Sequence, residues 1–471
     1  MRGELVALCA TLVLAAGLRL HGLDQWPLEL DEVYTYLRSF DLGRFNARPL
    51  YFLIQRAFLE LLPHDGFYLR LPALVFGLAG VWATWALGRT AFGARAGLVA
   101  AFLAAVSPWH LYASQFARYW SLVYLLAAGV CTLLLRAVDT GRKGAYLGAL
   151  ALVLLGMLSH PTFALPLVGF VLGLYLVDRS GAVKWPWPPR RAWYLLWGPL
   201  LALGLVGFAA LAVAGHLGAL RNGDSRGSLA TLRLVPAMAQ WAGPVIMAAA
   251  VAAGVGLFAA RPADRRWATA ALLGAASCVG LLLLASLMTA VYSDYGLSMM
   301  PLAFVTIGGG LQRVGEALPK RDARVFSVAA VAVLAAGVLP GVVSHLSDGT
   351  RHDVRPAYDY LRAEFARGRR APVYAPSRDL HAVYAPGLPY KRIGTDSTRL
   401  AEAVRTTGGF WLVGFYRRDG MVMASEAVEA WTRAHCHSVL QTQRPRLDYR
   451  IYRVELHWCG HAAAAASGTP R

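Results

Sequence analysis

Long apolar segments separated by short charged loops constrain the fold of this chain more than any other feature. Most of these segments have about 17–25 residues, the length that crosses a bilayer as a helix. Hydrophobic residues make up 57% of the chain and its mean hydropathy is +0.45, which excludes an ordinary soluble fold. We therefore expect a polytopic α-helical membrane protein.

About eleven apolar segments can be delimited along the chain. They cover residues 4–20, 71–92, 97–113, 119–136, 145–160, 162–177, 193–215, 236–260, 267–290, 297–312 and 325–345. The first segment lacks a secretory cleavage site, so we expect it to remain as an uncleaved span.

The loops between these segments indicate how the chain is oriented. The net charge of +19 comes mainly from arginines and lysines in alternate short loops, a pattern typical of cytoplasmic loops rather than of a nucleic-acid groove. This pattern places the N-terminus in the cytoplasm, and an odd number of spans places the C-terminal region outside. We expect a multi-pass protein of the cell (inner) membrane with a periplasmic or extracellular C-terminal domain.

The composition changes near residue 346, where polar segments with strand and helix patterns alternate. We predict a transmembrane domain over residues 1–345, a small external α/β domain over 346–460 and a disordered tail over 461–471. Cys436 and Cys459 could form a disulfide if the compartment is oxidising.

The first external loop, residues 21–70, belongs to the predicted transmembrane domain but is not a plain linker. Residues 31–40 and 49–62 have helical patterns, and such helices would lie along the membrane surface. Within the first helix, spacings of three, four and seven residues would place Asp31, Tyr34 and Arg38 on one face together with Thr35.

Asp31 and Glu32 are the candidate catalytic residues of this loop. A carboxylate that is partly shielded from water at the outer face of a membrane can act as a general base toward an acceptor hydroxyl. The alternative is that Asp31 caps a helix that begins at Glu32. The two roles are compatible, because a capping carboxylate is also a fixed one.

Arg48 stands in the stretch ARPLYF, three residues before Tyr51. A guanidinium at this place could bind a phosphate through two parallel hydrogen bonds. It could equally bind lipid headgroups at the membrane surface.

The stretch SPWHLYASQFARYWSL, residues 107–122, joins the third and fourth predicted spans on the outer side. Arg118 lies among Gln115, Tyr119 and other aromatic residues at this boundary. It could be an interfacial anchor. The positive-inside pattern does not account for an arginine on the outer side, which favours a ligand-binding role.

His160 and Asp294 lie at two further outer turns and are weaker candidates, since a histidine before proline or an acid at a helix boundary is often structural. The chain contains no Walker loop, dinucleotide fingerprint or zinc motif. We assign no metal ligand and no certain cofactor, although a divalent cation could assist.

Three stretches in this order resemble the GT-C fold glycosyltransferases that use lipid-linked sugars, in the bacterial branch related to protein O-mannosyltransferases and aminoarabinose transferases. LELDEVYTY is similar to the family's Asp-Glu motif, ARPLYFLI to its His/Lys-Pro-Pro-Leu-Tyr segment, and SPWHLYASQFARYWSL to its Ser-Gln-Glu-Ala-Arg-x-Tyr segment. Ala47 and Arg48 depart from the second motif and Phe116 from the third. Asp294 stands where relatives often have arginine.

The resemblance implies inverting transfer of a sugar from a polyprenyl-phosphate donor to an external glycan, lipid or protein. Asp31 would be the catalytic base, with Glu32 beside it, and Arg118 and Tyr119 would organise the lipid-phosphate site. The candidate substrate-binding residues are Tyr34, Arg48, Tyr51, Gln115, Arg118, Tyr119, His160 and Asp294. The alternatives are a polysaccharide polymerase or ligase, and a flippase or transporter of lipid-linked glycans.

Overall fold

The computed structural model describes most of the chain, namely residues 2–41, 49–179, 228–286, 291–417, 420–421, 424–442 and 452–460. The predicted span 193–215, Arg48 and the predicted tail 461–471 lie outside these residues. The chain divides into two compact units, which are described separately below. The first unit comprises Met1–His21, Gly43–Ala57 and Arg70–Val342, and the second comprises Gly22–Leu42, Phe58–Leu69 and Val343–Arg471.

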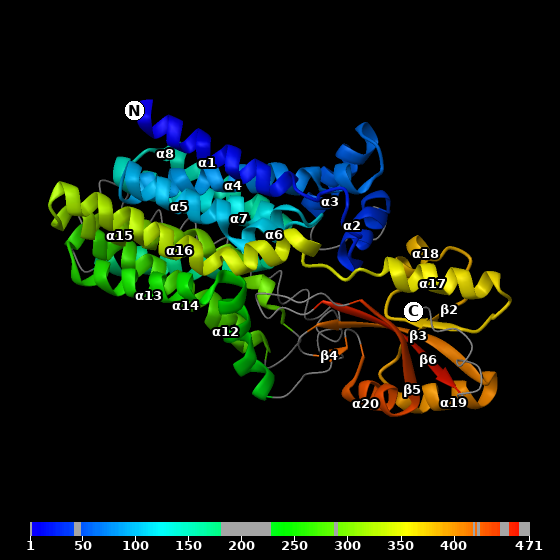
Figure 1. Ribbon diagram of the computed structural model, residues 1–471. Coiled ribbons are helices and arrows are strands. Elements are labelled where there is room, and N and C mark those ends of the chain that lie inside the picture. Colours follow the sequence, from blue (N-terminus) through cyan, green and yellow to red (C-terminus); the bar gives the residue numbers. More distant parts are fainter. Residues whose placement is uncertain are drawn as a thin grey trace. The chain divides into compact units, whose positions relative to one another are not determined.

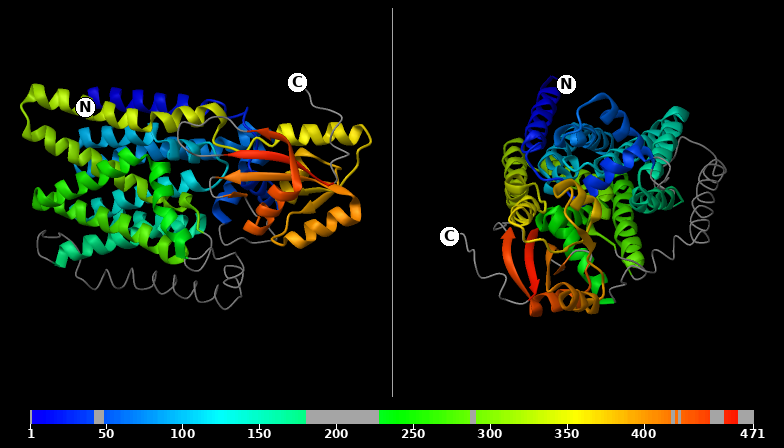
Figure 2. Two further views of the ribbon diagram at one scale, coloured as in Figure 1. Left: turned by 60° about the horizontal axis from the view of Figure 1, so that its bottom comes forward. Right: turned by 90° about the vertical axis from the view of Figure 1, so that its right-hand side faces the viewer.

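The first unit is helical, and its long helices lie side by side (Figures 1 and 2). Its helices are α1 (Arg2–Leu20), α5 (Ala94–Val106), α6 (Pro108–Ser114), α7 (Trp120–Thr140), α8 (Lys143–Ser159), α9 (Ala164–Arg179), α12 (Ser228–Ala242), α13 (Pro244–Ala259), α14 (Pro262–Ser286) and α15 (Met300–Ala317), with the short 3₁₀ helices η1 (Pro161–Phe163) and η2 (Ser293–Met299). Three helices, α3 (Pro49–Leu61), α4 (Gly66–Ala91) and α16 (Lys320–Asp348), contribute residues to both units.

Among the described residues, 5 helices are long and apolar enough to cross a membrane, or up to 7 spans if each of two bent pairs is one span. The predicted polytopic helical fold is therefore confirmed, whereas the number of about eleven spans stays a prediction. One bent pair is α5 and α6, which meet at 65°. Pro108 begins the second helix of this pair, as expected for a residue that suits the first helical turn but cannot continue a helix.

The second unit contains the predicted α/β region, built on one mixed sheet. Its strands are β1 (Val373–Ala375), β2 (Tyr390–Arg392), β3 (Gly409–Arg417), β4 (Gly420–Met421), β5 (Cys436–Thr442) and β6 (Arg453–Gly460). They are ordered β2-β1-β3-β6-β5, with β4 beside β3. The strands β1, β2 and β3 are parallel, and β6 runs antiparallel to both β3 and β5.

Helices cover both faces of this sheet. Alternate residues of β3 point to opposite faces, so each face contributes its own apolar side chains. Trp411, Val413 and Phe415 pack with α17 (Arg355–Ala366) and α18 (Arg378–Tyr384). Phe410 and Leu412 pack with α19 (Ser397–Thr407) and α20 (Glu426–His435).

The helix α2 (Leu30–Phe40), predicted over 31–40, belongs to the second unit rather than to the helical bundle. Its Val33 is fully buried in the same apolar cluster as Val354, Tyr358 and Leu361, and Leu30 packs against that cluster. The residues that carry the Asp-Glu motif therefore share a compact unit with the α/β region. The division into a transmembrane domain that ends at residue 345 and an external domain that ends at residue 460 stays a prediction.

Candidate active site

Asp31 lies in the first turn of α2, because the residues just before it determine where the helix begins. Glu29 is the N-cap residue with extended backbone angles, and its backbone N–H donates to the Glu32 carboxylate at 3.1 Å, as in a capping box. The helix thus begins at Leu30, so the alternative in which Asp31 caps a helix starting at Glu32 is wrong. Asp31 is half-buried at the positive end of the helix macrodipole, a place that stabilises a negative charge.

The predicted face of α2 forms only in part. Tyr34 and Arg38 lie together, with the guanidinium carbon 5.3 Å from the ring centre, and Arg38 also pairs with Asp41 at 3.1 Å. Thr35 is fully buried, and its hydroxyl donates to the Asp31 carbonyl at 2.8 Å. Asp31 and Tyr34 are both half-buried, so these two predicted residues of α2 remain candidates to meet a substrate.

Glu32 has a different environment from Asp31, because its side chain is fully buried. The Arg351 guanidinium approaches its two carboxylate oxygens at 3.3 and 3.4 Å, and both side chains are 0% exposed. A carboxylate held in this way is poorly placed to reach an acceptor. This environment favours a role for Glu32 in holding α2.

In the first unit, three other predicted residues come together around the Tyr119 ring. The His160 ring stacks on it at 4.4 Å, and the Tyr51 ring meets it edge-on at 6.5 Å. The Arg118 guanidinium carbon lies 5.3 Å from the same ring centre. Tyr295, which was not predicted, lies 5.5 Å from the His160 ring. This cluster combines one cation with several aromatic rings.

His160 is oriented by the backbone that follows it. The backbone N–H of Thr162 donates to His160 Nδ1 at 3.2 Å, and the Thr162 hydroxyl lies 2.7 Å from the same nitrogen. In the neutral ring, the hydrogen therefore resides on Nε2. Asp294 lies half-buried in η2, beside Tyr295 in the sequence.

Gln115 is engaged with the end of α1. Its side-chain amide donates to the carbonyls of Leu18, Arg19 and His21 at 3.3, 2.8 and 3.0 Å, which satisfies carbonyls that a helix end leaves free. These contacts give Gln115 a structural task in holding the segment that leads to Arg118.

Sequence reasoning missed a second half of this arrangement. Arg19 is fully buried, and its guanidinium donates to the carbonyls of Ala104 and Ala105 at 3.2 and 3.0 Å, so it caps the C-terminus of α5. It also lies 2.8 Å from His110 Nδ1. Arg19 ends the first apolar segment on the predicted outer side, the same departure from the positive-inside rule that singled out Arg118.

Within the described ranges, no group of three or more His, Cys, Asp or Glu side chains could hold a metal ion. The use of a divalent cation stays a prediction.

Known proteins resemble this chain in sequence over part of its length and in fold over nearly all of it. The family model for dolichyl-phosphate-mannose-protein mannosyltransferases matches residues 46–211. The structure of ArnT from Cupriavidus metallidurans in the apo state has a TM-score of 0.52 and 16% identity, and the match covers 99% of each chain. The chain has the GT-C fold.

A second structure with this fold is the oligosaccharyltransferase of Archaeoglobus fulgidus in the apo form, with a TM-score of 0.52, 12% identity and coverage of 94% of this chain and 80% of that chain. Comparison with curated proteins finds no match at the sequence level. The resemblance to GT-C transferases inferred from three motifs is thus confirmed. The matched range 46–211 includes Tyr51, Arg118 and His160 but not Asp31, which lies before it.

Proposed function

We propose that this protein is a membrane glycosyltransferase that transfers a sugar from a polyprenyl-phosphate donor to an acceptor at the outer membrane face. The observation that carries the proposal is a half-buried Asp31 fixed in the first turn of α2, in a chain with the GT-C fold. The match to mannosyltransferases that use a lipid-phosphate sugar supports the class of donor.

In the proposed reaction, the Asp31 carboxylate accepts the proton of an acceptor hydroxyl. The acceptor oxygen attacks the anomeric carbon from the face opposite the phosphate, and the bond between that carbon and the phosphate oxygen breaks. The sugar is transferred with inversion and the lipid phosphate leaves. Arg118 would stabilise the charge that develops on this leaving group, with Arg48 as a second candidate.

The proposed location is the cell membrane, with the second unit on the outer side. The Cys436–Cys459 disulfide in the α/β region supports this orientation, because disulfides persist in oxidising compartments. The basic loops on the opposite side support it independently.

The experiment uses the full-length protein in lipid nanodiscs. The donors are undecaprenyl-phosphate mannose, glucose and aminoarabinose, and the acceptor is an envelope extract from a strain that lacks the gene. We expect release of undecaprenyl phosphate from one donor and one sugar unit missing from that strain by mass spectrometry. Loss of the base in Asp31→Asn should slow transfer by about 10²–10⁴-fold.

Asp24→Asn is the matched control, since Asp24 is an exposed acid in the same external loop. It should transfer like the unaltered protein. Full transfer activity in the Asp31→Asn protein would refute the proposed role of Asp31 as the base. Movement of lipid-linked sugar across vesicles without release of lipid phosphate would instead identify a transporter.

A further inference from the structure

We infer that the α/β region serves as the scaffold of the catalytic helix, and that Arg351 and His352 are positioning residues for Asp31. This inference rests on the proposed function of Asp31 as the base. In this role the second unit holds the catalytic helix in place. Such a role is distinct from binding an acceptor or covering the active site. All the contacts that carry it lie within that unit.

The turn that follows α16 directs the chain toward α2. Gly349 and Thr350 both have left-handed backbone angles, with φ of 68° and 57°. A β-branched residue adopts this conformation only when the surrounding structure imposes it. Here the Thr350 N–H donates to the Asp348 carboxylate at 2.8 Å, and its buried hydroxyl lies 2.8 Å from His345 Nδ1. The two left-handed residues turn the chain so that Arg351 and His352 reach α2.

Trp26 shows how closely this turn is packed. A Cβ atom added at Gly349 would lie 2.4 Å from the Trp26 ring, and one added at Gly22 would lie 2.5 Å from it. The Arg351 guanidinium carbon lies 5.2 Å from the centre of the same ring. The indole therefore fixes the arginine from one side, and glycine is required where the ring meets the backbone.

Arg351 fixes Glu32, the residue directly after Asp31. Its Nε and Nη2 each approach one carboxylate oxygen, and its Nη1 donates to the Gly349 carbonyl at 2.8 Å. Two buried charges held in this bidentate geometry stabilise one orientation of the helix, because any rotation would leave a charge uncompensated.

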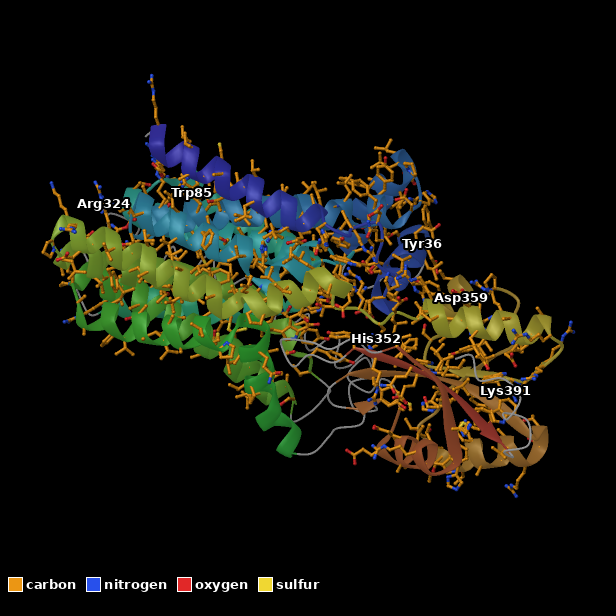
Figure 3. All side chains as sticks on the ribbon, viewed as in Figure 1. Tyr36, Trp85, Arg324, His352, Asp359 and Lys391 are labelled. Atoms are coloured by element: carbon orange, nitrogen blue, oxygen red, sulfur yellow. A yellow bond between two sulfur atoms is a disulfide. The ribbon has the colours of Figure 1, made fainter. Side chains whose placement is uncertain are left out.

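His352 fixes Glu29, two residues before Asp31. Its backbone N–H and its Nδ1 both lie 2.8 Å from one Glu29 carboxylate oxygen, and its Nε2 lies 3.1 Å from the Tyr416 carbonyl in β3. The ring thus connects the N-cap of α2 to the central sheet. His352 lies in the segment that joins α16 to α17 (Figure 3).

Apolar and hydrogen-bonding contacts extend the same attachment. Val33 of α2 is fully buried. The backbone N–H of Leu28, just before α2, donates to the Tyr384 hydroxyl of α18 at 2.7 Å. Asp31 therefore lies between anchored residues on both sides in the sequence, while its own side chain remains half-buried. Contacts of the neighbouring residues that hold the backbone of a reacting group in place are the arrangement expected of a scaffold.

The experiment compares Arg351→Ala, Arg351→Lys and the matched control Arg399→Ala in the full-length protein in nanodiscs. Arg399 is 81% exposed, in α19 of the same unit. Transfer kinetics use the undecaprenyl-phosphate sugar that the unaltered protein consumes. Hydrogen exchange of the peptide spanning residues 28–40 reports directly on α2, whether or not transfer occurs.

For Arg351→Ala we expect kcat to fall by about tenfold or more, with the KM for the lipid donor changed by less than about twofold, since positioning acts in the transition state. Exchange in α2 should rise by roughly 100-fold, because an unpaired buried carboxylate remains. Arg351→Lys should recover part of both, and Arg399→Ala should match the unaltered protein.

Unchanged exchange in α2, or a loss confined to KM, would overturn the inference. If Arg351→Ala does not fold, Glu32→Gln replaces it, since it keeps the size of the side chain while removing its charge. Full activity in Asp31→Asn would overturn the proposed base instead. The exchange measurement would still decide whether the Arg351–Glu32 pair holds α2.

Discussion

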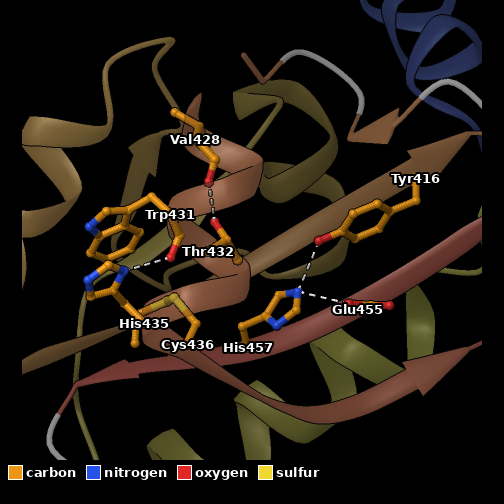
Figure 4. The surroundings of a disulfide bond; sticks show 9 residues. Tyr416, Val428, Trp431, Thr432, His435, Cys436, Glu455 and His457 are labelled. Atoms are coloured by element: carbon orange, nitrogen blue, oxygen red, sulfur yellow. Dashed lines mark hydrogen bonds and ion pairs between the residues drawn. A yellow bond between two sulfur atoms is a disulfide. The ribbon is translucent and has the colours of Figure 1, made fainter. Parts of the chain in front are cut away.

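The Cys436–Cys459 disulfide offers the sharpest test of how the α/β region is stabilised. It joins neighbouring residues of β5 and β6, close to the buried contacts of His457 with Tyr416 and Glu455 (Figure 4). The perturbation is the double replacement of both cysteines by serine. We expect the α/β region to remain folded but to lose stability, since the apolar cluster that contains Cys459 keeps its other members and the second cluster is unchanged.

The magnitude follows from the length of chain that the bond closes. The cysteines are separated by 23 residues in sequence. In the chain-entropy description, a closed loop of that length restricts the unfolded chain by about 3 kcal/mol. A change of this size raises the equilibrium constant for opening by roughly 100-fold.

The assay is hydrogen exchange of the amides of β3, the central strand, whose exchange requires opening of the sheet. Exchange there should accelerate by about 100-fold in the double variant, while the amides of α7 in the first unit should not change. Cys9→Ser, which alters an exposed free cysteine of α1, is the control. An acceleration below about twofold, or an equal effect in α7, would refute the entropic reasoning.

Three further predictions concern single side chains. Gln115→Leu should weaken the first unit by about 1–3 kcal/mol, because buried carbonyls at the end of α1 lose their donor; unchanged exchange at that end would contradict this. Arg19→Met should weaken the end of α5 similarly, measured by thermal unfolding in nanodiscs, and an unchanged midpoint would refute the cap. Burial lowers the pKa of His381, so the stability from its neutral ring is present above about pH 6.5 and lost as the pH falls through the lower folded pKa. His381→Gln should make the free energy of unfolding less dependent on pH. An unchanged slope of that free energy against pH would contradict the role of His381.

Patterns that depend on near neighbours could be read from the sequence. The lengths of apolar segments predicted the helical membrane fold, and alternation of strands and helices predicted the α/β region. The order of three motifs predicted the GT-C resemblance. Residues 107–122 were singled out as the boundary between the third and fourth segments, and α7 begins there at Trp120. The helix break at Ser107 and Pro108, inside the predicted segment 97–113, was not predicted.

Pairings between distant residues could not be read in this way. Glu32 and Arg351 are 319 residues apart, and their pairing depends on a turn at Gly349 and Thr350 that has no periodic pattern. The capping of α1 by Gln115 and of α5 by Arg19 likewise joins residues that are 96 and 86 positions apart in the sequence.

The sequence by itself determined that this protein is a membrane protein with a candidate base at Asp31, because span length and motif order are local properties of a chain. Only the tertiary structure decided that Glu32 is buried against Arg351 and that α2 belongs with the α/β region. The physical reason is that burial of a charge is stable only when a partner arrives from elsewhere in the chain. Which partner arrives depends on how the whole unit packs.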